Sequence, residues 1–377
     1  MTHVVSKFEE RMPAPARAAL VIALIYVFLV GVSSLEAGIK IMGADTQERL
    51  FSAVSNPIAG LCIGILGTVL VQSSSASTSV IVGLVATSQL GVGDAVPMVM
   101  GANIGTTVTN TLVSLGHVRR SAEFKRAFAA ATVHDFFNVM AVAILLPIEV
   151  IFGTISSIAE AMSERLVGAS GSDWKSPVKA WVKEPVSWIT DFWGGIAEGN
   201  VGGTLVVLTG LVIILSALAF ITKNMRKLVA ERIEQSVNNV LGKAGGAVAL
   251  LLGLIITVAV QSSSITTSIL IPLSAAGVLS LRNAYPVTLG ANVGTTITAL
   301  LAALAASSPD SLTVGLAHTT FNVLGIFLLY VIPLARDVPI RLAERLAEIA
   351  VEKRTLAVLY VLGTFIVAPL LGVALLR

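Results

Sequence analysis

The segment VQSSSASTS at residues 71–79 returns as VQSSSITTS at residues 260–268, and GANIGTTVT at residues 101–109 returns as GANVGTTIT at residues 290–298. Both pairs are 189 positions apart, and an ungapped alignment of the two regions gives about 22 identities in 46 positions. This similarity indicates a duplicated unit. Because polar side chains are costly in apolar surroundings, the repeated polar motifs predict a functional site.

The composition predicts an integral membrane protein built from helices. Hydrophobic residues make up 55% of the 377 residues and charged residues only 12%, whereas roughly a quarter of the residues in soluble domains are charged. Residues 18–35, 201–221 and 356–376 are continuous apolar runs of about 20 residues, long enough to cross ~30 Å of hydrocarbon. The net charge of +3 gives no reason to expect a nucleic acid partner.

The repeats divide the chain into six predicted units. Each repeat is expected to hold a re-entrant helical hairpin that turns at QSSS, a transmembrane helix broken at GAN-[IV]-GTT, and a segment with His-x-x-x-Asn. The units are a cytoplasmic N-terminus (1–17), transmembrane repeat 1 (18–150), an external amphipathic connector (151–200), transmembrane repeat 2 (201–335), a cytoplasmic amphipathic segment (336–354) and a C-terminal transmembrane helix (355–377).

The distribution of Lys and Arg predicts that the two repeats have inverted topology. The N-terminus and the loop at residues 119–126 are basic, which places both in the cytoplasm. The basic stretch 223–243 follows the first helix of repeat 2, whereas the matching stretch 40–56 follows a helix that has left the cytoplasm. The connector holds all four tryptophans, Trp174, Trp181, Trp188 and Trp193. It is either an interfacial segment or an amphipathic helix packed on the bundle.

The QSSS segments offer amide and hydroxyl groups but no charge. A single serine-rich tract is typical of helix packing in membranes, but two tracts beside glycine-rich segments favour a binding site. Gly101, Gly105, Gly290 and Gly294 favour local unwinding, and the freed backbone groups then need partners. In transporters such partners are substrates and ions, with helix N-termini facing anions.

Basic side chains are missing from the motif regions. Residues 50–118 contain no Lys or Arg, and residues 244–310 contain only Arg282. An anion held there would rely on helix N-termini, hydroxyl donors and cations that travel with it. Sodium suits the available oxygen ligands, and there is no Cys/His arrangement for zinc. Sodium is therefore expected as a co-substrate, and no cofactor is expected.

Asp135 is the one carboxylate expected deep in a helix of repeat 1. It either caps a helix or pairs with His134, or it binds a cation whose charge it balances. His134 and His318 recur at equivalent places in the two repeats. They either form hydrogen bonds between helices or carry protons.

These residues resemble the type II sodium-dependent phosphate cotransporter family, most closely its bacterial branch. The paired QSSS tracts, the paired GAN-[IV]-GTT segments and RAFAAATVHDFFN at residues 126–138 carry the resemblance, which extends from the first helix to about Ala335. The resemblance implies phosphate bound by six serines: Ser73, Ser74, Ser75, Ser262, Ser263 and Ser264. It implies sodium bound at or beside nine residues: Gln72, Gln261, Asn103, Asn292, Thr106, Thr109, Thr295, Thr298 and Asp135.

The resemblance further implies electrogenic import of inorganic phosphate by alternating access, in the cytoplasmic (inner) membrane of a bacterium, because electrogenic members carry an aspartate at the position of Asp135. His117 and Arg120 stand where vertebrate members place polar and acidic residues near one sodium site. The connector has no cysteine and no glycosylation sequon. An uncoupled anion channel, an exporter, a membrane scaffold and a homo-oligomer remain open, whereas no nucleophile and base set or Walker-type loop indicates an enzyme.

Overall fold

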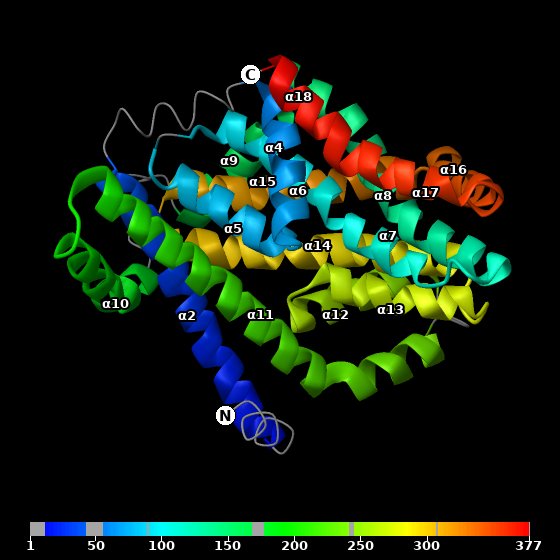
Figure 1. Cartoon of the computed structure of the whole chain (residues 1–377), viewed down its shortest axis with the longest axis horizontal. Coiled ribbons are helices and arrows are strands. Elements are labelled where there is room, and N and C mark those ends of the chain that lie inside the picture. Colours follow the sequence, from blue (N-terminus) through cyan, green and yellow to red (C-terminus); the bar gives the residue numbers. More distant parts are fainter. Residues whose placement is uncertain are drawn as a thin grey trace.

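The computed structural model describes residues 12–42, 56–88, 90–167, 177–240, 245–306 and 308–376, with the side chains of 177–179 and 229–240 left aside. Every regular element in these ranges is a helix (Figure 1), which confirms the all-α prediction. The basic residues before position 12, Trp174, Lys243 and most of the stretch 40–56 lie outside the described residues.

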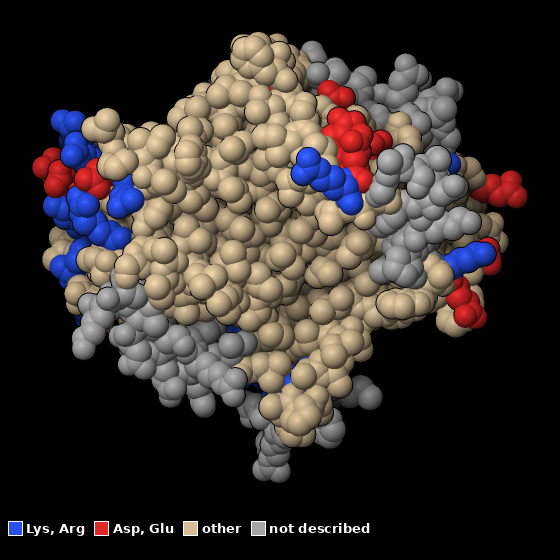
Figure 2. All heavy atoms as spheres, turned by 180° about the vertical axis from the view of Figure 1, so that it is seen from behind, with Lys and Arg blue, Asp and Glu red and all other residues tan. Residues whose placement is uncertain are grey.

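Six helical segments are long and apolar enough to cross a membrane. Figure 2 shows a wide face without charged side chains, with Lys and Arg gathered at one edge of the view and acidic residues mostly near the other. The chain is therefore a multi-pass membrane protein. The segments are α2 (Ala14–Ile41), α8 (Ser121–Phe152), Gly199–Leu228 of α11 (Gly199–Val240), α14 (Leu281–Ala306), Pro309–Val331 formed by α15 (Pro309–Ile326) and η1 (Phe327–Val331), and Arg354–Leu376 formed by α17 (Arg354–Leu362), η2 (Gly363–Val367) and α18 (Ala368–Leu376).

Four short apolar helices form two pairs, and each pair is joined at a QSSS segment. The pairs are α4 (Pro57–Val71) with α5 (Ser74–Val85), and α12 (Gly246–Val260) with α13 (Ser263–Ala275). With 12 to 15 residues, each helix is about 18–22 Å long and too short to cross the hydrocarbon alone. Their re-entrant placement in the membrane stays a prediction.

The long helices form the frame around these pairs. Helices α2 and α11 lie side by side along much of their length, and α14 runs through the middle of the molecule with α15 beside it (Figure 1). Around this frame lie α9 (Thr154–Val167), α10 (Pro177–Gly194) and α16 (Pro333–Glu352). Trp181 and Trp188 of α10 are about two-thirds exposed, whereas the Trp193 indole donates a hydrogen bond to Thr209 at 2.9 Å.

The predicted helix break at the GAN motif occurs in the first half only. Helices α6 (Val92–Thr106) and α7 (Val108–Leu115) meet at Thr107, but α14 continues through Leu281–Ala306. The prediction of a break was wrong for α14, and the expected unwinding at the GAN glycines occurs in neither half, because Gly101 and Gly290 both lie inside helices and serve close helix packing. A Cβ atom on Gly290 would overlap the carbonyl oxygen of Leu250 in α12.

Asp135 is not the only buried carboxylate of the first half. Glu36 and Glu149 are each 6% exposed, and both lie near helix ends where donors are available. Glu36 pairs with Lys40 at 2.5 Å, and Glu149 accepts the backbone N–H of Ile155 at 2.6 Å at the start of α9. Such partners satisfy buried charge.

Candidate substrate site

The two QSSS turns face one cavity of about 350 Å³, here called the serine cavity. Helix α11 covers it with Leu215, Leu218, Ala219 and Thr222. No charged side chain of the described residues lines it. The residues expected to bind phosphate are all among the lining residues, together with both glutamines: Gln72, Ser73, Ser74, Ser75, Gln261, Ser262, Ser263 and Ser264.

The backbone at each turn aims a helix N-terminus at this cavity. Gln72 and Gln261 adopt the left-handed conformation, with φ of 57° and 56°, which ends one helix and turns the chain. Ser73 and Ser262 are then extended and cap α5 and α13, since their hydroxyl oxygens accept the N–H groups of Ala76 at 3.2 Å and Ile265 at 3.4 Å. Two helix N-termini therefore border one cavity, an arrangement suited to an anion.

The remaining serine hydroxyls differ from the capping pair. Among the described residues, the hydroxyl groups of Ser74, Ser75, Ser263 and Ser264 have no hydrogen-bond partner; only their backbone carbonyls accept bonds from the next turn. Ser74 and Ser263 are 4% and 3% exposed. None of these four oxygens belongs to the fully buried, unpartnered polar atoms of the described residues, so the hydroxyl groups open onto the serine cavity and are available to a bound ligand.

Two glutamine–threonine pairs join the turns to the GAN segments. Thr109 of α7 donates to the side-chain oxygen of Gln72 at 3.2 Å, and Thr298 of α14 donates to that of Gln261 at 2.9 Å. The glutamine amides also donate to the backbone of the preceding helix, at 2.6 and 2.7 Å. These four predicted sodium-site residues therefore lie together in two matched groups of oxygen atoms at the edge of the serine cavity.

The GAN asparagine of each half is hydrogen-bonded to the other half, in what we call the asparagine lock. Asn103 donates to Asn322 at 2.8 Å and pairs with His318 at 3.1 Å. Both His318 and Asn322 lie on α15. The two histidines of the lock are buried and form hydrogen bonds between helices.

The second set of bonds in the asparagine lock matches the first. Asn292 donates to Asn138 at 2.8 Å and pairs with His134 at 2.5 Å. Because an amide oxygen can only accept, His134 donates through Nε2, and its Nδ1 faces the Asn110 amide at 3.5 Å. Asn103 and Asn292 are thus hydrogen-bonded to side chains of the opposite half. Neither asparagine is among the residues that line the serine cavity.

The buried threonines of the GAN segments lie on their own helices. The Thr106 hydroxyl donates to the carbonyl of Ala102 at 3.0 Å, and that of Thr295 to Ala291 at 3.1 Å. Each residue is one turn from the asparagine lock. Neither is among the residues that line the serine cavity.

Asp135 lies apart from the serine cavity, in the middle of α8, with no exposed surface. Its Oδ2 accepts hydrogen bonds from Thr111 at 3.2 Å and Tyr360 at 3.0 Å. Its Oδ1 has no hydrogen-bond partner among the described residues. Asp135 therefore does not cap α8, and His134 bonds to Asn292 and Asn110 instead of to Asp135.

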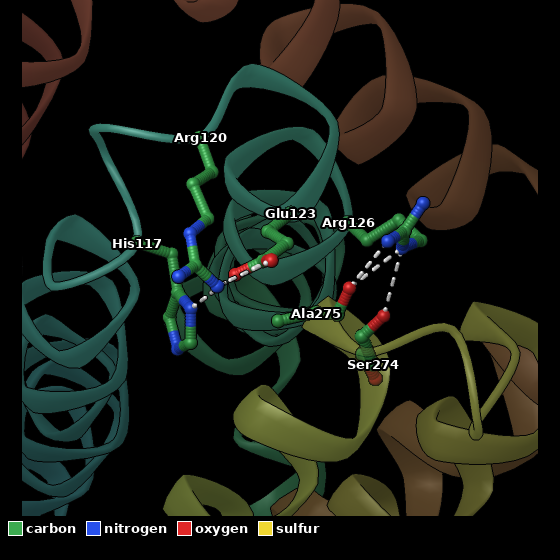
Figure 3. A network of polar contacts seen from close by, with 6 residues as sticks. All are labelled: His117, Arg120, Glu123, Arg126, Ser274 and Ala275. Atoms are coloured by element: carbon green, nitrogen blue, oxygen red, sulfur yellow. Dashed lines mark hydrogen bonds and ion pairs between the residues drawn. The ribbon is translucent and has the colours of Figure 1, made fainter.

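Polar contacts at the start of α8 hold the C-terminal end of α13 near the basic loop (Figure 3). Arg126 donates to the carbonyl of Ala275 at 2.8 and 2.5 Å and to that of Ser274 at 3.2 Å, at the C-terminal end of α13, where a cation is favourable. Glu123 accepts from Arg120 at 2.9 Å and lies 3.6 Å from His117. His117 and Arg120 therefore pair with one carboxylate.

Two residues of these networks carry no motif from which they could have been predicted. Asn110 receives hydrogen bonds from Thr267 at 2.9 Å and Ser268 at 3.2 Å on α13, but its counterpart in the second half is Ala299, so the repeat gave no signal. Tyr360 lies in the C-terminal extension, where no motif marked it. A lone tyrosine hydroxyl in an apolar run was the only available signal.

The comparisons with known proteins agree with the motifs. A family model described as Na+/Pi-cotransporter matches residues 27–169 and 213–338. The sodium-dependent phosphate transport protein 2B of Homo sapiens is 34% identical over 444 residues, which cover 94% of this chain and 64% of that protein. The protein 2A of Rattus norvegicus is 32% identical over 424 residues, covering 94% and 66%. No solved structure matches significantly.

The chain thus spans slightly less than two thirds of the length of these relatives. The family match covers both QSSS turns and both GAN segments, which form the serine cavity and its surroundings. Because this match extends over more than half of its residues, the chain belongs to the Na+/Pi-cotransporter family, a family of transporters.

Proposed function

We propose that this protein imports inorganic phosphate together with sodium ions. The observation that carries the proposal is the serine cavity, where six serines and two helix N-termini meet without any lining Lys or Arg. Relatives that match 94% of the chain are named sodium-dependent phosphate transport proteins. Hydroxyl donors and helix N-termini recognise the oxygen atoms of phosphate, and the missing charge is supplied by the co-transported cations.

The phosphate oxygens are assigned to the hydroxyls that have no other partner in the part of the chain that the structure describes. Ser74, Ser75, Ser263 and Ser264 donate to the anion, while Ser73 and Ser262 hold the helix N-termini in place. Hydrogen bonds to an ionised acceptor are roughly twice as strong as neutral ones. The cavity therefore binds phosphate mainly through short-range hydrogen bonds that depend on the position of both turns.

Sodium is assigned to the oxygen groups next to the cavity and to Asp135. The Gln72–Thr109 and Gln261–Thr298 pairs supply neutral oxygens within reach of both the turns and the GAN segments. Thr106 and Thr295 follow one turn after the asparagine lock, and we assign Asn103 and Asn292 to holding these helices. The unpartnered Oδ1 of Asp135 suits a further ion, whose charge would make import electrogenic.

The transport mechanism we propose is alternating access between two inverted repeats. Two helix pairs of similar length end at the same cavity from separate parts of the chain, so a change in their relative tilt would open the cavity to one side at a time. We place the protein in the inner membrane of a bacterium. The short connector without cysteines or sequons supports this location.

Uptake by reconstituted protein tests the proposal. Proteoliposomes would receive radiolabelled phosphate with an inward sodium gradient, with potassium replacing sodium, and with the gradient collapsed by a sodium ionophore. Accumulation above the external concentration should require the sodium gradient. Uptake that only equilibrates, at the same rate in potassium, would contradict sodium coupling and identify an anion channel.

A further inference from the structure

A second cavity lies between the first turns of α12 and α14, the helix η1, and α16. Its volume is about 190 Å³, and its basic lining residues are Arg282 and Arg336. Tyr330 and the buried Tyr285 also line it, with their rings packed edge to face at 5.6 Å. We call it the arginine cavity. None of its lining residues belongs to the serine cavity.

Both arginines are held in defined positions. Arg282 forms two parallel hydrogen bonds with Asp337, at 2.9 and 3.1 Å. Hydrogen bonding to Arg282 lowers the pKa of the Asp337 carboxyl, so this ion pair stays charged. Arg336 donates through Nε to the carbonyl of Tyr330 at 2.7 Å and stacks on the Tyr330 ring at 4.7 Å. These two contacts, one to the backbone and one to the ring of Tyr330, orient the terminal nitrogens of Arg336.

The local charge around the arginine cavity favours an anion. Among the described residues, Asp337 is paired with Arg282, and Glu344 acts on Arg282 electrostatically, whereas Arg336 and Arg341 add positive charge beside Asp337, so arginines outnumber carboxylates. Arg282 and Arg336 also lie in the first turns of α14 and α16, where backbone N–H groups carry partial positive charge. Guanidinium groups bind phosphate in a planar, bidentate geometry that suits this kind of recognition.

The surface next to the arginine cavity is apolar and exposed. Val331 and Leu334, on either side of the η1–α16 junction, are 51% and 91% exposed, and Val248 of α12 is 50% exposed. Large apolar side chains with this exposure, at the end of a segment long enough to span a membrane, form a surface suited to lipid chains. Lys and Arg gather at the end of the molecule that carries α16 (Figures 1 and 2), which is the cytoplasmic end by the positive-inside rule.

From this combination we infer that the arginine cavity binds the phosphate group of an anionic phospholipid, whose acyl chains lie along η1 and α12. The cavity is smaller than the roughly 300–1,000 Å³ of sites that enclose whole small molecules, so it fits a phosphate group with its chains outside. Basic pockets between membrane helices on the cytoplasmic side are suited to such headgroups. The inference is independent of the transported substrate.

The test is lipid retention measured by native mass spectrometry of the full chain in detergent. The probes are phosphatidylglycerol, phosphatidylcholine and inorganic phosphate. The test variant is Arg282→Gln with Arg336→Gln, and the control is Arg345→Gln with Arg354→Gln, which removes the same charge from exposed positions outside the cavity. Loss of an arginine–phosphate contact should weaken retention about tenfold or more.

The wild type and the control should retain phosphatidylglycerol, and the test variant should lose it. A second variant, Gly246→Ala, keeps every charge, but its Cβ would overlap the Tyr330 hydroxyl and disturb the cavity. It should also lose the lipid, and it keeps the test informative if the double variant does not fold. Equal retention by all variants, equal loss from the control, no preference over phosphatidylcholine, or displacement by millimolar inorganic phosphate would each overturn the inference.

Discussion

The serines of the two turns are expected to have two different roles, phosphate binding and helix capping, and single substitutions to alanine distinguish these roles. Ser74→Ala and Ser263→Ala each remove a hydroxyl that has no partner among the described residues, so the empty protein loses little. A hydrogen bond to a charged group contributes about 1.5–3 kcal/mol, so each variant should weaken phosphate binding roughly ten- to hundredfold. Ser73→Ala and Ser262→Ala instead remove N-caps, at a cost to stability of about 1 kcal/mol.

Two measurements on the same preparations distinguish these outcomes. Phosphate titrations of sodium-driven uptake in proteoliposomes give the apparent affinity, and thermal unfolding in detergent gives the stability. Ser74→Ala and Ser263→Ala should change the first and leave the second nearly constant, while the capping variants should lower the unfolding temperature. Wild-type apparent affinity in both Ser74→Ala and Ser263→Ala would refute the assignment and make these serines packing residues.

Three further predictions concern Asp135, its partner and the helix crossing. Asp135→Asn should import phosphate with less net current and a shallower sodium dependence; unchanged current per phosphate in a well-expressed variant would exclude the ligand role. Tyr360→Phe removes the 3.0 Å hydrogen bond to Asp135 and should lower the apparent sodium affinity up to about tenfold. The phosphate affinity measured in saturating sodium should stay unchanged. An unaltered sodium titration would contradict this prediction. Gly290→Ala should destabilise the protein by about 1–3 kcal/mol or more in thermal unfolding. The control Gly67→Ala should not, because an added Cβ at Gly67 meets no atom within 4 Å. Equal unfolding temperatures would show that the contact between α12 and α14 tolerates a side chain at Gly290.

The repeats predicted a polar site at the QSSS turns, and the family resemblance implied that serines of both turns share it. Residues 72–75 and 261–264 do line one cavity. The state of the GAN glycines could not be predicted in the same way. A glycine permits both unwinding and close packing, and the choice at Gly290 depends on the backbone of α12, which is distant in sequence. The contact from Tyr360 was equally invisible, since it comes from outside the repeats and beyond residues 27–169 and 213–338 of the family match.

The asparagine lock also has a consequence for how the protein is made. Asn103 finds its side-chain partners on α15, and Asn138 finds Asn292, so each half contains buried amides that only the other half can satisfy. A ribosome that has completed the first half has made helices whose polar groups cannot yet be paired in the membrane. Final packing of this half must wait until α14 and α15 have been inserted. Maturation of the core is therefore a late, post-insertional step, and the two halves depend on each other for assembly.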